Sequence, residues 1–382
     1  MDNLIEKQQH LVWLDVIRTV AMLMVIGVHC IDPFYISPTL GTQPEYKFWA
    51  AVYGSLFRPS VPIFVMMTGL LLLPVREQSL GVFYKKRIFR VLFPFLIWSV
   101  LYNLFPWFTG ILGLPKEIIG DFFCYVQGRE SQSLTDALKD VVMIPFNFSF
   151  KENHMWYIYL LIGLYLYMPF FSAWIEKTGR STKLVYLGIW FISLFLPYIS
   201  AYVSYYLYGE ATWNQFGLFY YFAGFNGYLL LGHYLKQGND WGLSKTLAVC
   251  LILFLSGYFI TYFGFSTAAA NPASTETDME LFFTFCSPNV ALMTIGLFLL
   301  LQKVRVRNSA VISLLANVTK YGFGIYIVHY FMVGPVFIFI SQFDFPIPLR
   351  VPVMAVLIFL LSWGFTWLMF RLLGQKAKWL MG

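Results

Sequence analysis

Residues 11–31 read LVWLDVIRTVAMLMVIGVHCI, an almost unbroken apolar stretch. A transmembrane helix needs roughly 20 consecutive, predominantly apolar residues, and similar stretches recur along the whole 382-residue chain. The chain is 59% hydrophobic and only 12% charged, whereas soluble domains carry about 25% charged residues. We therefore predict an all-α polytopic integral membrane bundle of about ten transmembrane helices, forming a single transmembrane domain over residues 1–382.

An even number of crossings puts both ends of the chain on the same side of the membrane. If the N-terminus is cytoplasmic, most of the 26 Lys and Arg residues fall in cytoplasmic segments, as the positive-inside rule requires. We therefore predict that both termini are cytoplasmic. The net charge of +7 then reflects short basic loops that contact lipid headgroups, and not a nucleic-acid site. The predicted spans are residues 11–31, 48–73, 88–109, 155–174, 184–206, 216–235, 246–264, 281–301, 321–341 and 351–373.

The first predicted span carries three ionisable side chains, Asp15, Arg18 and His29. A charge inside a span costs at least ~2.5–3.5 kcal/mol on insertion scales, so it usually faces the bundle interior and serves a function. Arg18 and His29 are almost three helical turns apart, which places them on one face and separates them by roughly 16 Å. We predict a functional polar stripe across much of the membrane. The alternative is a structural Asp15–Arg18 pair beside a core histidine.

A basic cluster lies at the predicted cytoplasmic start of the third span. Arg87 and Arg90 are three residues apart and share a helix face, and Lys86 lies beside them. Two guanidinium groups arranged in this way can bind phosphate in a bidentate manner, so we predict a site for a phosphorylated cytosolic ligand. The alternative is simple topological anchoring.

Other candidates are polar or aromatic side chains inside spans or near their edges. His329 lies well inside a predicted span, which favours a functional role. His154 lies where the chain re-enters the membrane, and helix capping or membership of an interfacial aromatic belt are alternatives there. The cysteines follow no metal-binding spacing and predict neither a zinc site nor a disulfide framework. The candidate substrate or secondary residues are Arg58, Glu152, His154, Trp156, Tyr326 and His329, and the cysteines are Cys30, Cys124, Cys250 and Cys286.

The motifs taken together resemble the acyltransferase 3 family of membrane O-acyltransferases, and the resemblance covers essentially the whole chain in order. One departure is Thr68-Gly69-Leu70, where the family usually has Ser-Gly-Phe or Ser-Gly-Tyr. The matching segments are Leu14-Asp-Val-Ile-Arg-Thr-Val-Ala21 with His29 completing R-x10-H, Val61-Pro-Ile-Phe-Val-Met-Met-Thr-Gly69, Arg87-x-x-Arg90, His154-Met-Trp-Tyr157 and Gly324-Ile-Tyr-x-x-His329.

This resemblance implies transfer of an acyl group, commonly acetyl from acetyl-CoA, to a hydroxyl of a cell-envelope glycan or lipid-linked sugar. The chain is similar to stand-alone family members that modify polysaccharides such as enterobacterial common antigen, and it suits a bacterial inner membrane. His29 would act as the general base, or form a transient acyl-histidine. Asp15 would hold Arg18 near the donor, while Arg87, Arg90 and Lys86 would bind the phosphates of the acyl-CoA without any metal.

Two other classes of function are compatible with buried charges in a polytopic bundle. One is a secondary transporter or a flippase for a lipid-linked sugar. A transporter would not need a cytoplasmic arginine pair aligned with a histidine stripe. The other is a structural subunit of a membrane complex, which would tolerate loss of His29.

Overall fold

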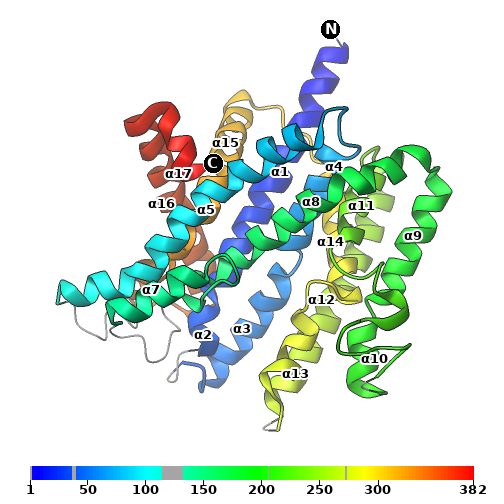
Figure 1. The fold of residues 1–382 in the computed structure, drawn as a ribbon. Coiled ribbons are helices and arrows are strands. Elements are labelled where there is room, and N and C mark those ends of the chain that lie inside the picture. The colour runs from blue at the N-terminus through cyan, green and yellow to red at the C-terminus, as the bar shows by residue number, and fades with distance from the viewer. Residues whose placement is uncertain (1, 37–39, 114–131, 205, 272) are drawn as a thin grey trace. The chain divides into compact units, whose positions relative to one another are not determined.

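The computed structural model describes residues 2–36, 40–113, 132–204, 206–271 and 273–382 (Figure 1). The chain divides into two compact units. The prediction of a single domain over residues 1–382 stays a prediction. The first unit comprises Met1–Met24, Gly54–Glu77 and Met168–Ala316, and the second comprises Val25–Tyr53, Gln78–Tyr167 and Asn317–Gly382.

All the regular secondary-structure elements of the described residues are helices. In chain order they are α1 (Asp2–Cys30), α2 (Asp32–Ile36), α3 (Pro44–Phe57), α4 (Ser60–Leu72), α5 (Leu80–Ile111), α7 (Leu134–Met143), η1 (Phe150–Met155), α8 (Trp156–Lys177), α9 (Arg180–Ser193), α10 (Leu196–Tyr202), η2 (Gly217–Phe219), α11 (Asn226–Tyr234), α12 (Leu243–Ala270), α13 (Glu276–Glu280), η3 (Leu281–Phe283), α14 (Pro288–Leu301), α15 (Ser309–Ser341), α16 (Ile347–Leu373), η4 (Gly374–Ala377) and α17 (Lys378–Met381).

Nine helical stretches within the described ranges are long and apolar enough to cross a membrane. Each coincides with one of the predicted spans, and the all-α membrane bundle is therefore confirmed. The stretches are Val12–Phe34, Pro44–Leu72, Leu80–Ile111, Phe150–Lys177, Arg180–Tyr202, Leu243–Ala270, Thr277–Leu301, Ser309–Ser341 and Ile347–Met381.

The predicted span 216–235 differs, because it is not one continuous helix. Phe216, Gly217 and Gly224 have positive φ angles, which interrupt a right-handed helix. Only the nine residues of α11 follow as a regular helix, and nine residues rise about 14 Å, less than a bilayer core of about 30 Å. The apolar composition of this segment was therefore a poor guide to its helix length.

Within the first unit, two hydrogen bonds nevertheless connect α11 and its end to the residues that flank α14. The Tyr228 hydroxyl donates a hydrogen bond to the Phe285 carbonyl just before α14, at 2.7 Å. At the other end, the Gln302 side-chain amide donates to the Leu235 carbonyl at 2.9 Å. The segment is therefore attached at both ends of α14, which belongs to a membrane-crossing stretch.

Two glycines allow α4 and α11 to pack closely in the first unit. A Cβ atom on Gly69 would lie 1.9 Å from the Leu229 carbonyl oxygen, and one on Gly232 would lie 1.9 Å from the Met66 carbonyl oxygen. Small residues at such contacts let helix backbones approach in a membrane. The glycine that ends the Val61–Gly69 motif is therefore required for helix packing.

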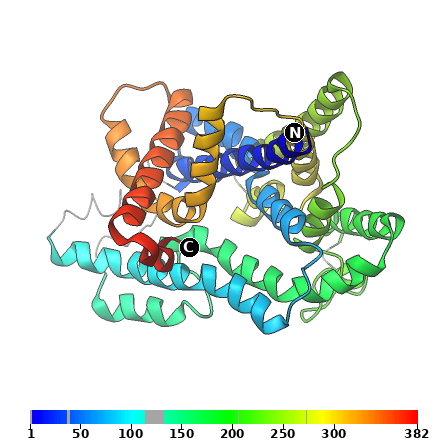
Figure 2. The same cartoon turned by 90° about the horizontal axis from the view of Figure 1, so that it is seen from above.

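In the second unit, α7 packs against the long helix α5, and Figure 2 shows them side by side. α7 begins at Leu134. Ser133 caps its N-terminus by accepting a hydrogen bond from the Asp136 amide at 3.1 Å. The Ser133 hydroxyl, together with Lys139, also lowers the pKa of the Asp136 carboxyl by hydrogen bonding. The charge thus favours the helix start.

Candidate active site

Three of the chain's five histidines meet inside the second unit. His29 lies at the end of α1, His154 in the η1 turn before α8, and His329 in α15. The ring centroids are separated by 5.4 Å for His29 and His329, 5.1 Å for His154 and His329, and 6.3 Å for His29 and His154. His154 and His329 are buried, and the His29 side chain is only 12% exposed. The structure thus brings together three predicted site residues that are far apart in sequence.

Each of these rings has one nitrogen held by an oxygen. The Nδ1 atom of His29 lies 2.8 Å from a carboxylate oxygen of Asp32, one helical turn further on. The Nε2 atom of His154 lies 3.3 Å from the Ile327 carbonyl oxygen, and Nδ1 of His329 hydrogen-bonds the Tyr326 carbonyl oxygen of its own helix. The rings therefore have fixed orientations.

Tyrosine side chains enclose the histidine cluster. The Tyr330 ring stacks on His154 with a centroid distance of 4.6 Å and meets the edge of His29 at 5.0 Å. The Tyr326 hydroxyl donates a hydrogen bond to the His154 carbonyl. These contacts connect α15 to η1 and keep His154 in place.

Tyr102 of α5 makes an unusual contact with α15. Its hydroxyl donates to the Ile327 carbonyl at 2.9 Å and accepts from the Phe331 amide at 3.1 Å. These two backbone groups are four residues apart and would pair with each other in a regular helix. The Tyr102 hydroxyl therefore bridges one step of the helical ladder beside His154, whose ring centroid lies 5.2 Å from that of Tyr102.

A buried polar network precedes His154. The Glu152 carboxylate accepts a hydrogen bond from Asn103 of α5 at 2.9 Å and closes a capping box with Ser149. The Lys151 side chain is 1% exposed and lies 2.6 Å from the Asp140 carboxylate of α7, and it also donates to the Asn103 carbonyl. This network attaches the η1 turn to α5 and α7, so Glu152 is placed as a residue that supports the site.

Three predicted site residues belong to the first unit. Arg18 and Asp15 form an ion pair at 3.3 Å on α1, with side chains 31% and 16% exposed. Arg58 is buried, donates to the Gly54 carbonyl at 3.1 Å and lies over the Phe283 ring at 4.0 Å. The Asp15–Arg18 pair is therefore present, while its action on the histidines and a substrate role for Arg58 remain predictions.

The predicted donor residues lie in the first turns of α5, in the second unit. Lys86 and Arg90 are exposed, and Arg87 is half-buried. Within the described residues, no carboxylate pairs with either arginine, and both lie near enough to the Tyr165 hydroxyl to act on it electrostatically. These cations are thus available to an anionic ligand.

Of the remaining predicted residues, Tyr326 contacts the histidine cluster, whereas Trp156 is placed differently. Trp156 is the first residue of α8, and its ring centroid lies 6.2 Å from that of Tyr157. Tyr157 in turn contacts Tyr326 at 5.8 Å. Trp156 thus lies two rings away from the site along this chain of contacts.

Sequence reasoning missed Asp32, Tyr102 and Tyr330. For Asp32 a signal existed, because it follows His29 by three residues, the spacing at which helical side chains meet. Tyr330 adjoins the predicted His329, but neighbouring residues on a helix point in different directions. Nothing in the sequence distinguishes Tyr102 from the chain's other 24 tyrosines.

An apolar groove of about 490 Å³ adjoins the site in the second unit. Its wall residue Phe331 stacks on Tyr102 with centroids 3.9 Å apart, so the groove and the histidine cluster share this aromatic pair. The groove is formed by α5, α15 and α16 and includes Leu101, Phe105, Phe108, Phe331, Met332 and Phe365.

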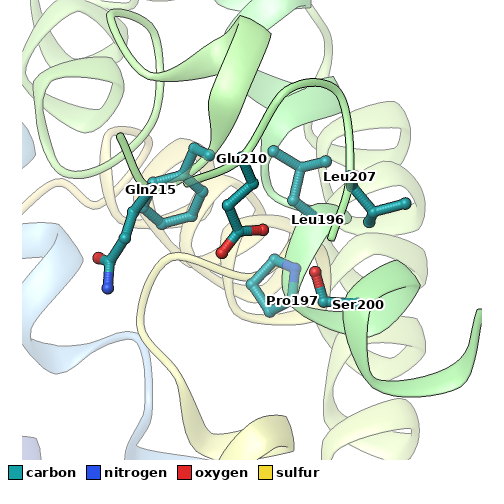
Figure 3. A pocket seen from close by; sticks show the side chains of 7 residues that line it. Leu196, Pro197, Ser200, Leu207, Glu210 and Gln215 are labelled. Carbon is teal, nitrogen blue, oxygen red and sulfur yellow. The ribbon is translucent and has the colours of Figure 1, made fainter. Parts of the chain in front are cut away.

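A smaller cavity of about 110 Å³ lies in the first unit, where Glu210 and Ser200 face it from the segments around α10 (Figure 3). Its lining contains one carboxylate and neither histidine nor cysteine. Such a lining has no imidazole or thiol that could take part in acyl transfer, so we assign no role to it.

In the part of the chain that the structure describes, no group of three or more His, Cys, Asp or Glu side chains is arranged to hold a metal ion. Cys250 and Cys286 are free thiols among the described residues, and Cys124 lies outside them.

Comparisons with known proteins identify the family. A family model described as "Acyltransferase domain", that of the acyltransferase 3 family, matches residues 11–367. No individual curated protein and no solved structure matches the chain significantly. The family match includes the segments that carry His29, His154 and His329. The chain therefore belongs to the acyltransferase 3 family of membrane acyltransferases.

Proposed function

We propose that this acyltransferase is an O-acetyltransferase that moves an acetyl group from cytosolic acetyl-CoA to a hydroxyl of an envelope glycan or lipid-linked sugar. We place it in the bacterial plasma membrane with both termini in the cytoplasm, as its basic loops favour. The observation that carries the proposal is the His29–Asp32 pair within a buried cluster of three histidines.

In the proposed reaction, His29 is the general base and Asp32 positions it. Asp32 accepts the Nδ1 proton of His29, which leaves the Nε2 lone pair free to take the proton of an acceptor hydroxyl. The acceptor oxygen then bonds to the thioester carbon, and the carbon–sulfur bond breaks. His29 returns its proton to the departing CoA thiolate, so the cluster is regenerated. Transient acylation of His29 is a second route with the same products.

For the donor site we propose Arg87, Arg90 and Lys86. They project from the start of α5, and the helix reaches the histidine cluster at Tyr102, about 18 Å further along its axis. Acetyl-CoA carries its phosphates and its thioester at opposite ends of a long flexible arm. An elongated donor of this kind can bind the arginines by its diphosphate and still present its acetyl group to His29.

For the acceptor, the apolar groove favours a molecule attached to a lipid. Two of its three helices, α5 and α15, also contact the cluster through Tyr102 and Tyr330, and the groove is lined almost entirely by carbon. A hydrocarbon chain in the groove would hold the attached sugar beside Tyr102 and His154. Lipid-linked sugars and glycolipids are therefore the acceptors that this site would suit best.

The reaction can be tested with purified protein in lipid nanodiscs. CoA release from acetyl-CoA is followed with a thiol reagent in the presence of envelope glycolipids, and the products are analysed by mass spectrometry for added acetyl groups. We expect CoA release and acetylated product with the native protein and neither with His29→Ala. Uptake of labelled sugar into vesicles without CoA release would instead identify a transporter or flippase.

His233→Asn provides the matched control for this experiment. His233 lies in the first unit and donates from Nδ1 to the Leu73 carbonyl at 3.1 Å, a bond that the asparagine amide can reproduce. Removing this imidazole should leave activity near the native level. Equal loss in both variants would mean that the effect of His29→Ala is a general consequence of losing a histidine.

A further inference from the structure

The hydrogen bonds of the histidine cluster determine which ring nitrogens carry protons. A carbonyl oxygen only accepts hydrogen bonds, so Nε2 of His154, held by the Ile327 carbonyl, must be the protonated nitrogen of that ring. By the same reasoning Nδ1 of His329 is protonated, because it is held by the Tyr326 carbonyl. In the neutral rings, Nδ1 of His154 and Nε2 of His329 are then lone-pair acceptors.

These two acceptor nitrogens are buried and unsatisfied. Neither Nδ1 of His154 nor Nε2 of His329 has a hydrogen-bond partner among the described residues, and the two side chains are 2% and 0% exposed. Buried polar atoms in native proteins nearly always have a partner, and an exception calls for an explanation such as a bound ligand. The two rings are adjacent, with centroids 5.1 Å apart.

Hydrogen-bond donors satisfy such lone pairs. The carbonyl oxygen of a thioester carries no proton and cannot bind there, and an anionic phosphate would be repelled by the nitrogen lone pairs. A hydroxyl group, in contrast, donates its proton to nitrogen and needs no change in the neutral tautomers. The pair therefore differs in chemistry from the arginines at the start of α5, which suit an anion.

We propose that His154 and His329 form a recognition subsite for additional hydroxyl groups of the acceptor, next to the hydroxyl that His29 deprotonates. This inference rests on the proposed acetyl transfer for the role of His29. It specifies the acceptor as a polyol, such as a sugar with neighbouring hydroxyls. A polyol places one hydroxyl on His29 and further hydroxyls on the lone pairs of His154 and His329, one proton for each nitrogen, whereas a simple alcohol occupies only one of these positions.

Nitrogen-15 NMR tests the binding step without requiring any transfer. The protein is labelled with ¹⁵N-histidine, reconstituted in nanodiscs without acetyl-CoA, and titrated with glycerol as a small polyol. The lone-pair nitrogens of His154 and His329 resonate apart from N–H nitrogens, and both should shift when glycerol donates to them. The ether 1,2-dimethoxyethane, which has oxygen acceptors but no donor, should leave them unchanged. The five histidines of the chain keep the spectrum simple.

Paired amide variants separate the lone pair from the structural bond in each ring. Glutamine places an amide near Nε2 and asparagine places one near Nδ1. His154→Gln and His329→Asn therefore keep the bonds to Ile327 and Tyr326 but remove the lone pair. His154→Asn and His329→Gln can supply an amide oxygen where the lone pair was.

We expect the lone-pair-deleting variants to bind glycerol about fivefold more weakly, which corresponds to roughly 1 kcal/mol for one hydrogen bond. The variants that supply an oxygen should bind it within about twofold of the native protein. Equal weakening in all four variants would indicate a purely structural role and overturn the proposal.

Three further results would overturn the proposal. These are equal shifts with the ether, no shift with glycerol, or a stoichiometric metal ion on the same nitrogens. Failure of acetyl transfer with intact glycerol shifts would reject the proposed reaction and leave the subsite standing. Transfer that proceeds without any effect of glycerol on these nitrogens would reject the subsite alone.

Discussion

Asp32→Asn should slow acyl transfer strongly, because in the proposed reaction the Asp32 carboxylate holds Nδ1 of His29 and so positions the imidazole as the base. The hydrogen bond spans 2.8 Å, and a bond to a charged group contributes about 1.5–3 kcal/mol. Since 1.36 kcal/mol corresponds to a factor of ten in rate, we expect kcat to fall about 100-fold, and at least tenfold.

The assay is steady-state release of CoA from acetyl-CoA in nanodiscs, with thermal unfolding of each variant measured in parallel. Asp136→Asn is the matched control, since Asp136 lies on the exposed surface of α7 and pairs with Lys139; its kcat should stay within about twofold. The unfolding temperature of Asp32→Asn should change little, because asparagine has the same shape. A loss of less than threefold in a well-folded Asp32→Asn protein would refute the assignment of His29 as a base held by this carboxylate.

The remaining predictions concern the other proposed site residues. His29→Ala should abolish transfer while the protein still inserts and folds, as judged by membrane yield and product analysis; normal product levels would contradict the catalytic role. Arg18→Ala should lower both yield and activity, because it leaves Asp15 unpaired inside a span, where an isolated charge costs at least ~2.5 kcal/mol; a stable, active variant would argue against the pair. Exchange of both Arg87 and Arg90 for lysine should weaken acetyl-CoA binding at least several-fold in calorimetry with normal insertion, since lysine lacks the bidentate fork; unchanged affinity would return the cluster to an anchoring role.

Most membrane-crossing helices could be predicted from the sequence, because a bilayer imposes one requirement that composition alone can meet. A run of about 20 apolar residues is long enough to span and has few stable alternatives to a helix. Segment 216–235 satisfies that requirement in composition and still forms only the short α11. The positive φ angles at Phe216, Gly217 and Gly224 interrupt the helix there. Hydropathy measures only how apolar a segment is and contains no information about backbone conformation.

The members of the candidate site could also be named in part, since an ionisable group within an apolar span is costly and therefore conspicuous. His29, His154 and His329 were found in this way. Their convergence could not be found, because helix periodicity describes each span separately and contains no information about which faces meet. Asp32 lies just beyond the first predicted span, where an acidic residue is common. Only the structure shows that its carboxylate contacts Nδ1 of His29.

The tertiary contact at Tyr102 joins three elements of the candidate site, namely α5, α15 and the η1 turn. In an uninterrupted helix each carbonyl is engaged by the amide four residues later, but the Tyr102 hydroxyl stands between the Ile327 carbonyl and the Phe331 amide, bonded to both. The Ile327 carbonyl also accepts from His154. A side chain from α5 thus joins the backbone of α15 to the turn that carries His154. Tyr102→Phe keeps the ring and removes only this bridge, so any loss of activity in that variant would measure how strongly the cluster depends on it.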